Sequence, residues 1–317
     1  FAVANVKEAA DIREMGSGWP ILVLGPLLAE EDKALLDYDL TATLSSTNEL
    51  NRLEKLAKEN DRSIPVHLKV DTGMGRLGIW WEEAVELLGR IGRSKGIKLN
   101  GILTHFAQPS DEVFTREQRN RFLSVIKSLT PLDDPSFFIH ADNSSSLRSL
   151  EGSSAFNAVR IGLLQFGIGS PRGSLLADLR VEPVLSFHSK LAMIKKLPEG
   201  TSLSYDRQHT LKRDSNIGII GAGYGDAIPL HCGNRAFGLI KGKRYPLVGR
   251  VTMDQTLIDL TDSKTELELG ETVTLVGKQN EEEILLSSLA EHADTIPWEL
   301  LCSITKRVPR IYKTQRE

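Results

Sequence analysis

The sequence predicts an α/β plus β protein: a (β/α)8 barrel that lacks its first strand, followed by a mostly β C-terminal domain. Between residues 1 and 170, short apolar runs alternate with amphipathic stretches, a pattern typical of parallel strands joined by helices. From residue 181 onward, turn sequences instead of helical patterns separate runs rich in β-branched residues. We therefore expect domains at residues 1–178 and 179–317.

The number of apolar runs favours a barrel over an open sheet. Seven runs are strand candidates, at residues 1–4, 21–24, 41–44, 64–70, 99–104, 137–140 and 156–160. A closed barrel of this class has eight strands, so one strand is expected to be missing. The alternative is an open doubly wound sheet, but no G-x-G-x-x-G turn follows an early strand.

Helical patterns lie between these runs, at residues 5–15, 29–40, 46–60, 81–94 and 111–129. Ser46 and Glu49 form a capping-box pattern, and Gly16 is a plausible C-terminal stop. In the second domain, strands are expected at residues 185–197, 216–220, 237–240, 245–251, 256–260 and 272–276. There only residues 282–293 look helical.

Composition excludes several classes of protein. The 317 residues carry 39 Lys+Arg against 42 Asp+Glu without basic runs, which argues against a nucleic-acid surface. No apolar stretch reaches the ~18 residues that span a bilayer, and we expect no signal peptide. The two cysteines, Cys232 and Cys302, fit a reducing cytosol better than a disulfide framework. We expect a cytoplasmic protein with no membrane or nucleic-acid partner.

Polar residues follow several predicted barrel strands, where barrel active sites lie. Each group alone has a plain structural reading, as a Gly-rich turn, a structural histidine or a helix cap. Together they place cations, glycines and helix-start hydroxyls at one end of the barrel, which suits a small phosphorylated cofactor. They are Lys69 and Arg76, His105, Ser144, and Arg160 with Gly162. In the second domain, the segments around Tyr205, Tyr224 and Met253 are expected to be structural turns, with Met253 buried.

These residues belong to motifs that resemble the alanine racemase family. The motifs occur in the family's order, and the resemblance extends over nearly the whole chain. They are residues 69–78 (KVDTGMGRLG), 104–107 (THFA), 159–163 (VRIGL), 203–205 (LSY), 223–226 (GYGD), 248–255 (VGRVTMDQ) and 308–312 (VPRIY). The resemblance implies a homodimeric pyridoxal 5'-phosphate (PLP) enzyme that interconverts L- and D-alanine for peptidoglycan, with a barrel followed by a β domain.

The resemblance also implies roles in proton transfer. Racemisation removes the α-proton on one face and returns it on the other, so it needs two bases. Tyr205 would be one base, donated across the dimer into the partner's barrel, supported by His105 and Arg160. Arg160 would face the pyridine nitrogen of PLP, and because an arginine cannot hand over a proton, it would leave that nitrogen unprotonated.

Other positions are assigned to binding by the same resemblance. Arg76 would contact the phenolic oxygen of PLP and the substrate carboxylate, and Lys69 matches a position that can be carbamylated and would then orient Arg76. Met253 of the partner would touch the substrate. The phosphate would be held by Ser144 and the backbone of Gly162 and Leu163; Tyr224 and Asp254 would lie near Met253.

Two of the departures from the family pattern concern the cofactor, and a third is Phe166 in place of the usual tyrosine after the eighth strand. Trp298 occupies the position of a phosphate-binding tyrosine, and an indole N–H donates a hydrogen bond but cannot accept one. The family's Lys-Ala-x-Ala-Tyr-Gly segment, which carries the lysine that binds PLP covalently and acts as the second base, is not found in the chain. That segment ends the first barrel strand, which is the strand missing from our count. We therefore expect the chain to be a fragment of an active racemase.

Three other functions are alternatives for a chain with this framework. PLP-dependent decarboxylases share the barrel but need a Gly-rich phosphate loop and a catalytic cysteine, and neither Cys232 nor Cys302 lies in such a motif. A non-catalytic dimer partner is the non-enzymatic alternative, but its unpaired barrel edges would favour aggregation. Serine or broad-specificity racemases use the same framework, and no residue here excludes them.

The fragment hypothesis predicts that the 317-residue chain alone does not racemise alanine. Borohydride reduction in the presence of PLP, followed by peptide mapping, is expected to find no lysine adduct because the anchoring lysine lies outside the chain. Measurable racemisation, or an adduct mapped to one lysine of this chain, would contradict the hypothesis.

Overall fold

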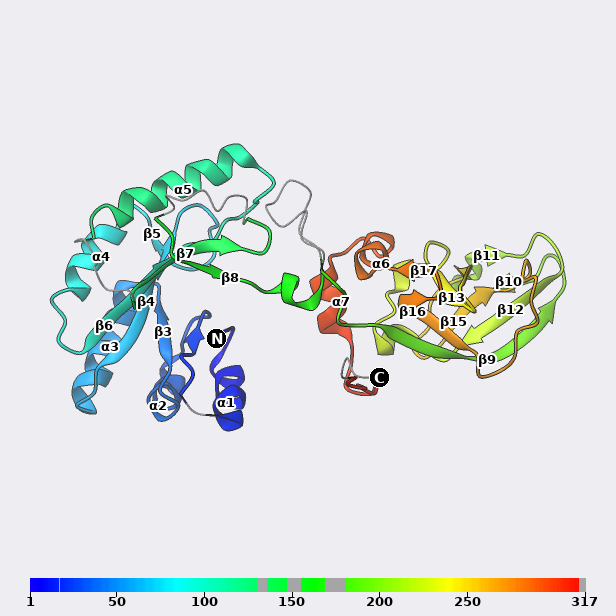
Figure 1. The fold of residues 1–317 in the computed structure, drawn as a ribbon, viewed down its shortest axis with the longest axis horizontal. Coiled ribbons are helices and arrows are strands. Elements are labelled where there is room, and N and C mark those ends of the chain that lie inside the picture. The colour runs from blue at the N-terminus through cyan, green and yellow to red at the C-terminus, as the bar shows by residue number, and fades with distance from the viewer. Residues whose placement is uncertain (17, 130–135, 147–154, 169–180, 314–317) are drawn as a thin grey trace. The chain divides into compact units, whose positions relative to one another are not determined.

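The structure is a computed structural model, and it describes residues 1–16, 18–129, 136–146, 155–168 and 181–313. The chain divides into two compact units (Figure 1). Residues 1–162 belong to the first unit, and residues 163–168 and 181–313 belong to the second. In the described residues, no helix has both the length and the apolar character needed to cross a bilayer.

The first unit is built on a parallel sheet whose strands follow one another in chain order. Each strand pairs in parallel with the next, and β5 (Ile79–Trp80) pairs with β4 beside this path. All seven predicted strands are confirmed, and the sheet forms a nearly closed barrel. The strands are β1 (Ala2–Val3), β2 (Leu22–Val23), β3 (Thr41–Leu44), β4 (Ile64–Asp71), β6 (Ile97–Leu103), β7 (Phe138–Asn143) and β8 (Ala158–Arg160).

Helices connect these strands as predicted. Ser46 caps its helix by accepting a hydrogen bond from the Glu49 N–H at 3.2 Å, and the Glu49 carboxylate accepts from the Ser45 N–H at 2.6 Å. Gly16 is the C-cap of the first helix. The helices are α1 (Val6–Met15), α2 (Asp32–Asp37) preceded by the 3-10 turn η1 (Ala29–Glu31), α3 (Thr47–Glu59), α4 (Ala84–Ile91) and α5 (Glu112–Ile126).

Strand β4 has apolar side chains on one face and polar side chains on the other. Side chains alternate between the two faces of a strand. Val66, Leu68 and Val70 are buried in the apolar core with residues of the surrounding helices. His67 and Lys69 therefore lie on the opposite face, and both are also buried, each at 6% exposure. Buried polar groups need partners, so this inner face calls for a polar network.

The second unit is an antiparallel sheet that closes on itself. Its order is β13-β14-β15-β12-β9-β16-β17, and β13 also pairs with β16. The prediction of a mostly β domain is confirmed. The strands are β9 (Phe187–Leu197), β12 (Ser215–Ile220), β13 (Phe237–Ile240), β14 (Lys243–Val248), β15 (Thr256–Asp259), β16 (Thr272–Gln279) and β17 (Glu282–Ile284). A short hairpin joins β10 (Ser202–Leu203) to β11 (His209–Thr210).

The expectation of a single helix at residues 282–293 is wrong in two respects. Residues 282–284 form β17, which pairs with the end of β16, and only Leu286–His292 are helical (α6). A second helix, α7, spans Pro297–Ser303 and begins with proline at its first turn. Its seven residues are too few to show a helical period in the sequence.

Candidate functional site

The polar side chains of the first unit follow β4, β6, β7 and β8. These strands are parallel, so their carboxyl ends lie at one edge of the sheet, as in other barrels. The structure brings the sequence-predicted residues of this unit to that edge. Lys69 lies in β4, and Arg76 lies in the loop that follows it. His105 follows β6, Ser144 follows β7, Arg160 ends β8, and Gly162 comes shortly after β8.

Arg160 is the centre of this edge. One terminal nitrogen lies 2.8 Å from His140 Nδ1 and 3.1 Å from the His140 carbonyl oxygen. The other donates to the Thr104 carbonyl at 2.8 Å and the Ala141 carbonyl at 3.0 Å, and lies 3.3 Å from His105 Nδ1. One guanidinium thus links the ends of β6, β7 and β8. We call Arg160 with His67, His105 and His140 the Arg160 cluster.

The proton positions in this cluster follow from Arg160. A guanidinium only donates hydrogen bonds, so Nδ1 of His140 must accept. The neutral ring then carries its proton on Nε2, which lies 2.9 Å from His67 Nδ1. His67 accepts in turn and carries its own proton on Nε2. His105 also accepts through Nδ1.

Electrostatics favours the same uncharged histidines. Burial lowers the pKa of His140 to about 2 and that of His67 to about 4, and the positive charge of Arg160 adds to both shifts. Burial, followed by Arg160, Arg76 and Lys69, lowers the pKa of His105 to about 4. Burial lowers the pKa of Arg160 itself to about 10, which leaves it charged at neutral pH. The cluster therefore has one fixed charge.

The loop after β4 carries Arg76 and is shaped by Asp71. One carboxylate oxygen of Asp71 accepts from the N–H groups of Gly73, Met74 and Gly75, at 2.9, 2.9 and 3.2 Å. Gly73 has φ 136°, a conformation that favours glycine. A Cβ at Gly78 would lie 2.7 Å from the Asp71 backbone nitrogen. The glycines of the motif are thus required by this turn.

Positive charge is in excess at this edge. Burial lowers the pKa of Lys69 to about 8, and Arg76 and Arg160 add to the shift against the opposing effect of Asp71. Asp142 is already paired with Arg119, at 2.9 Å. Lys69, Arg76 and Arg160 therefore create a site for an anion.

A hydroxyl and a backbone amide lie together beside these cations. The Gly162 N–H donates to Ser144 Oγ at 3.1 Å. Such a pair is suited to a phosphate. Leu163 is buried and begins the 3-10 turn η2 (Leu163–Phe166), which belongs to the second unit. The helix expected after the 144–146 hydroxyls falls on residues outside the described part.

Tyr205 lies in the second unit on a turn with unusual backbone. It begins the 3-10 turn η3 (Tyr205–Arg207), and its neighbours Ser204 and Asp206 both have φ 60°. Ser204 Oγ donates to the Arg250 carbonyl at 2.6 Å, and Arg250 also pairs with Asp206. Positive φ at non-glycine residues is unfavourable and persists where surrounding contacts enforce it. The turn holds Tyr205 with 69% of its surface exposed.

Tyr224 and Met253 lie on two loops that contact each other. Tyr224 begins the 3-10 turn η4 (Tyr224–Asp226), and its N–H donates to the Thr252 carbonyl at 3.0 Å. The expectation that Met253 is buried is wrong, because it is 54% exposed. Its backbone is fixed by the neighbouring loop while its side chain faces outward. Asp254 is held by Arg307 at 2.8 Å.

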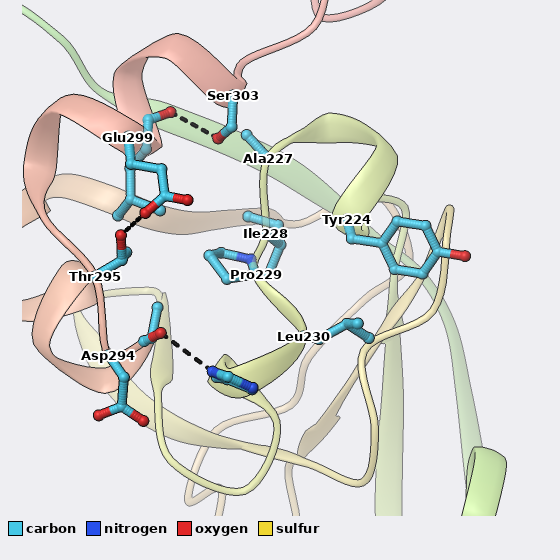
Figure 2. Close-up of a pocket in the computed structure, with 12 residues that line it drawn as sticks. Tyr224, Ala227, Ile228, Pro229, Leu230, Asp294, Thr295, Glu299 and Ser303 are labelled. Carbon is cyan, nitrogen blue, oxygen red and sulfur yellow. Dashed lines mark hydrogen bonds between the residues drawn. The ribbon is translucent and has the colours of Figure 1, made fainter.

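A cavity of about 410 Å³ in the second unit lies between the turn η5 (Leu230–Cys232) and α7 (Figure 2). Its floor includes Ile228 and Pro229, and Asp294 and Glu299 stand on one wall. Its described lining contains no lysine or arginine. This cavity is therefore unsuited to a phosphate, unlike the Arg160 edge of the first unit. Trp298 lies beside Glu299 on α7 and is 45% exposed.

Sequence reasoning missed three groups of residues. His67 and His140 were not selected, although His67 precedes Lys69 by two positions and so shares its face of β4. Thr72 and Thr104, whose hydroxyls lie 2.8 Å apart, were also missed. Arg307 was not identified because its partners lie 53 and 81 residues away along the chain.

Comparison with known proteins gives a consistent match. Residues 1–170 match the N-terminal domain of alanine racemase, and residues 184–312 match its C-terminal domain. Alanine racemase from Halothermothrix orenii is 34% identical over 317 residues, covering 99% of this chain and 83% of that protein. Alanine racemase from E. faecalis superimposes with a TM-score of 0.88 at 31% identity, covering 99% of this chain and 83% of that one. A Bartonella henselae alanine racemase with covalently bound pyridoxal phosphate has the same fold, with a TM-score of 0.87 at 24% identity; 99% of this chain and 84% of that chain are covered.

The Arg160 cluster predicts a specific pH dependence of stability. His67 and His105 have pKa values near 4 in the fold, below the ordinary value of 6.5. Between these values the unfolded chain binds more protons, so the free energy of unfolding is expected to fall as the pH falls. Arg160→Gln removes a charge that lowers both pKa values, and should make this dependence shallower.

Urea unfolding of the first unit across this pH range measures the effect. Arg213→Gln, a surface charge of the second unit, is the matched control and should keep the wild-type slope. An equally steep slope in Arg160→Gln would show that Arg160 does not set the histidine protonation.

Proposed function

The chain belongs to the alanine racemase family, and we propose that the full-length enzyme interconverts L-alanine and D-alanine with PLP as its cofactor. The observation that carries the proposal is the Arg160 cluster, in which one buried cation faces uncharged histidines. It stands with Lys69 and Arg76 in an anion-binding edge of the barrel. The proposed roles of individual residues come from the family resemblance and are supported by their placement.

The residues of the first unit fit PLP. The phosphate matches the Ser144 hydroxyl and the Gly162 N–H, which lie together at 3.1 Å, with the backbone of Leu163 next in the chain. Arg76 is suited to the phenolic oxygen and to the substrate carboxylate. When bound, PLP supplies an electron sink that stabilises the negative charge left when the α-proton departs.

Arg160 controls how strong that sink is. We assign it to the pyridine nitrogen, to which a guanidinium donates a hydrogen bond without giving up its proton. The His140 and Thr104 contacts fix the orientation of the guanidinium. Arg160 would thereby leave the ring nitrogen unprotonated and weaken the electron sink, which would suppress side reactions such as transamination.

Tyr205 takes or returns the α-proton on one face of the substrate. A free tyrosine has a pKa near 10, so it needs supporting charges to act as a base. The proposed support comes from His105 and Arg160 of the barrel into which it inserts. Because Tyr205 and Met253 are 69% and 54% exposed, they are available to a second copy of the chain. We propose a homodimer in which each copy supplies these side chains to the other's barrel.

Lys69 orients Arg76 in the proposed site. A pKa of about 8 leaves part of its amine uncharged at neutral pH, and that form can add to CO2. The new N–C bond gives a carbamate anion and releases one proton. An anion at this position would pair with Arg76 and reduce the excess positive charge. Tyr224 and Asp254, beside Met253, would complete the substrate side of the site.

In the cell, the proposed product D-alanine would supply peptidoglycan. We place the enzyme in the cytoplasm, where the precursors that incorporate D-alanine are made.

Tyr205→Phe tests the proton-transfer role. The variant of the full-length enzyme should racemise alanine ~100- to 10,000-fold more slowly, because a positioned acid–base group contributes on that scale. Exchange of the α-hydrogen with solvent deuterium should be lost for one alanine enantiomer and kept for the other. Tyr312→Phe, an exposed tyrosine near the C-terminus, is the control and should behave as wild type. Loss of exchange for both enantiomers would argue against a one-face base.

Mixing two inactive variants tests the shared site. Tyr205→Phe keeps an intact barrel, and Arg76→Gln keeps an intact Tyr205. If Tyr205 acts in the partner's barrel, dimers with one copy of each hold one complete site, and mixing after reversible dissociation should restore activity. If Tyr205 acts in its own barrel, the mixture should stay inactive.

A further inference from the structure

Arg307 joins two loops that carry candidate substrate-contacting residues. It lies in the segment that follows α7 and belongs to the second unit. Its guanidinium donates to both carboxylate oxygens of Asp226, at 2.7 and 2.8 Å. It also donates to Asp254 Oδ1 at 2.8 Å and to the Met253 carbonyl at 3.1 Å. We call residues 223–228 the Tyr224 loop and residues 252–255 the Met253 loop.

The two loops interlock through their backbones as well. The Gly225 N–H donates to the Met253 carbonyl at 2.9 Å, the same oxygen that Arg307 contacts. A Cβ at Gly223 would lie 2.1 Å from the Thr252 carbonyl oxygen, and one at Gly225 would lie 2.4 Å from Arg307. Glycine at both positions permits this close approach. The loops and Arg307 therefore form one packed group.

The chemistry of this contact is specific to arginine. A guanidinium presents planar, paired donors that match a carboxylate and can reach a second acceptor at the same time. A lysine ammonium carries the charge without this geometry. Thr305, two residues earlier, donates through Oγ1 to the Gly225 carbonyl at 2.8 Å. The segment that carries Arg307 is thereby anchored to the Tyr224 loop at a second point.

The side chains held by this arrangement face outward. Tyr224 and Met253 are 44% and 54% exposed, so their own packing does little to fix them. Arg307 instead contacts the loops that carry them, through the Asp226 carboxylate and the Met253 carbonyl. We propose that Arg307 is a positioning residue for the racemase, which sets Tyr224 and Met253 relative to each other so that they meet the substrate. This role rests on the proposed function, because the substrate contacts of both residues come from it.

The test compares Arg307→Lys and Arg307→Gln with wild type in the full-length enzyme. Arg244→Gln is the matched control, because Arg244 also joins a carboxylate (Glu282) and a backbone carbonyl (Glu283), each at 2.7 Å, at β17. Hydrogen–deuterium exchange of peptides that contain the two loops reports their order independently of activity. Steady-state kinetics with alanine reports KM and kcat separately.

We expect faster exchange in both loops and a roughly 10- to 100-fold loss of kcat/KM in Arg307→Gln, because misplaced binding groups have effects of this size. The loss should lie mainly in KM, since the loops bind substrate and do not carry the proton. Arg307→Lys should be intermediate, and Arg244→Gln should match wild type in both readouts. If Arg307→Gln fails to fold, Arg307→Lys alone decides, by the same two readouts.

Two results would overturn the proposal. Unchanged exchange in both loops would show that Arg307 does not order them. Faster exchange with unchanged KM would show that the contact is structural and has no effect on substrate. A wild-type enzyme without racemase activity would instead refute the proposed function, and with it the role toward substrate. The exchange data would then still decide whether Arg307 orders the loops.

Discussion

The buried charge of Arg160 is the interaction on which the candidate site depends. A cation inside a barrel is costly unless its donors are satisfied, and this guanidinium meets that requirement by binding carbonyl oxygens at the ends of β6 and β7. The same donors force His140 and His105 to accept, which sets their tautomers. Burial, with the charge of Arg160 added, keeps both rings neutral. Arg160 thus supplies the positive charge of the site, sets which histidine nitrogens carry protons, and links the ends of three strands.

The surroundings of Arg160 explain why an anionic cofactor suits the barrel. Lys69 stands on the inner face of β4, and the Asp71 turn directs the chain toward Arg76. Burial lowers the pKa of Lys69, and the charges of Arg76 and Arg160 lower it further, a repulsion that a bound phosphate or carboxylate would relieve. The cavity of the second unit beside α7 lacks this feature, because the carboxylates Asp294 and Glu299 line it and no lysine or arginine does among its described residues. Charge therefore distinguishes the two places.

In the proposed homodimer, the second unit would have to present side chains outward to a partner and still hold them in place. Tyr205 is kept on a turn between two residues of positive φ, and Met253 lies on a loop bound through its backbone. In both cases the stabilising contacts are made by the backbone and by neighbouring residues, and the side chain itself stays exposed. This arrangement is what a residue donated to another copy of the chain requires, because its final packing partner is supplied only on association.

The sequence by itself determined the strands of the barrel, the helices between them, the β character of the second unit and the residues of the family motifs. These features are local: apolar period, capping residues and turn glycines are visible over a few positions. Only the tertiary structure decided that His67 and His140 continue the contacts of Arg160, that Met253 is exposed, and that Arg307 joins two distant loops. Those facts depend on strand register and on pairs of residues far apart in the chain, which no local pattern records.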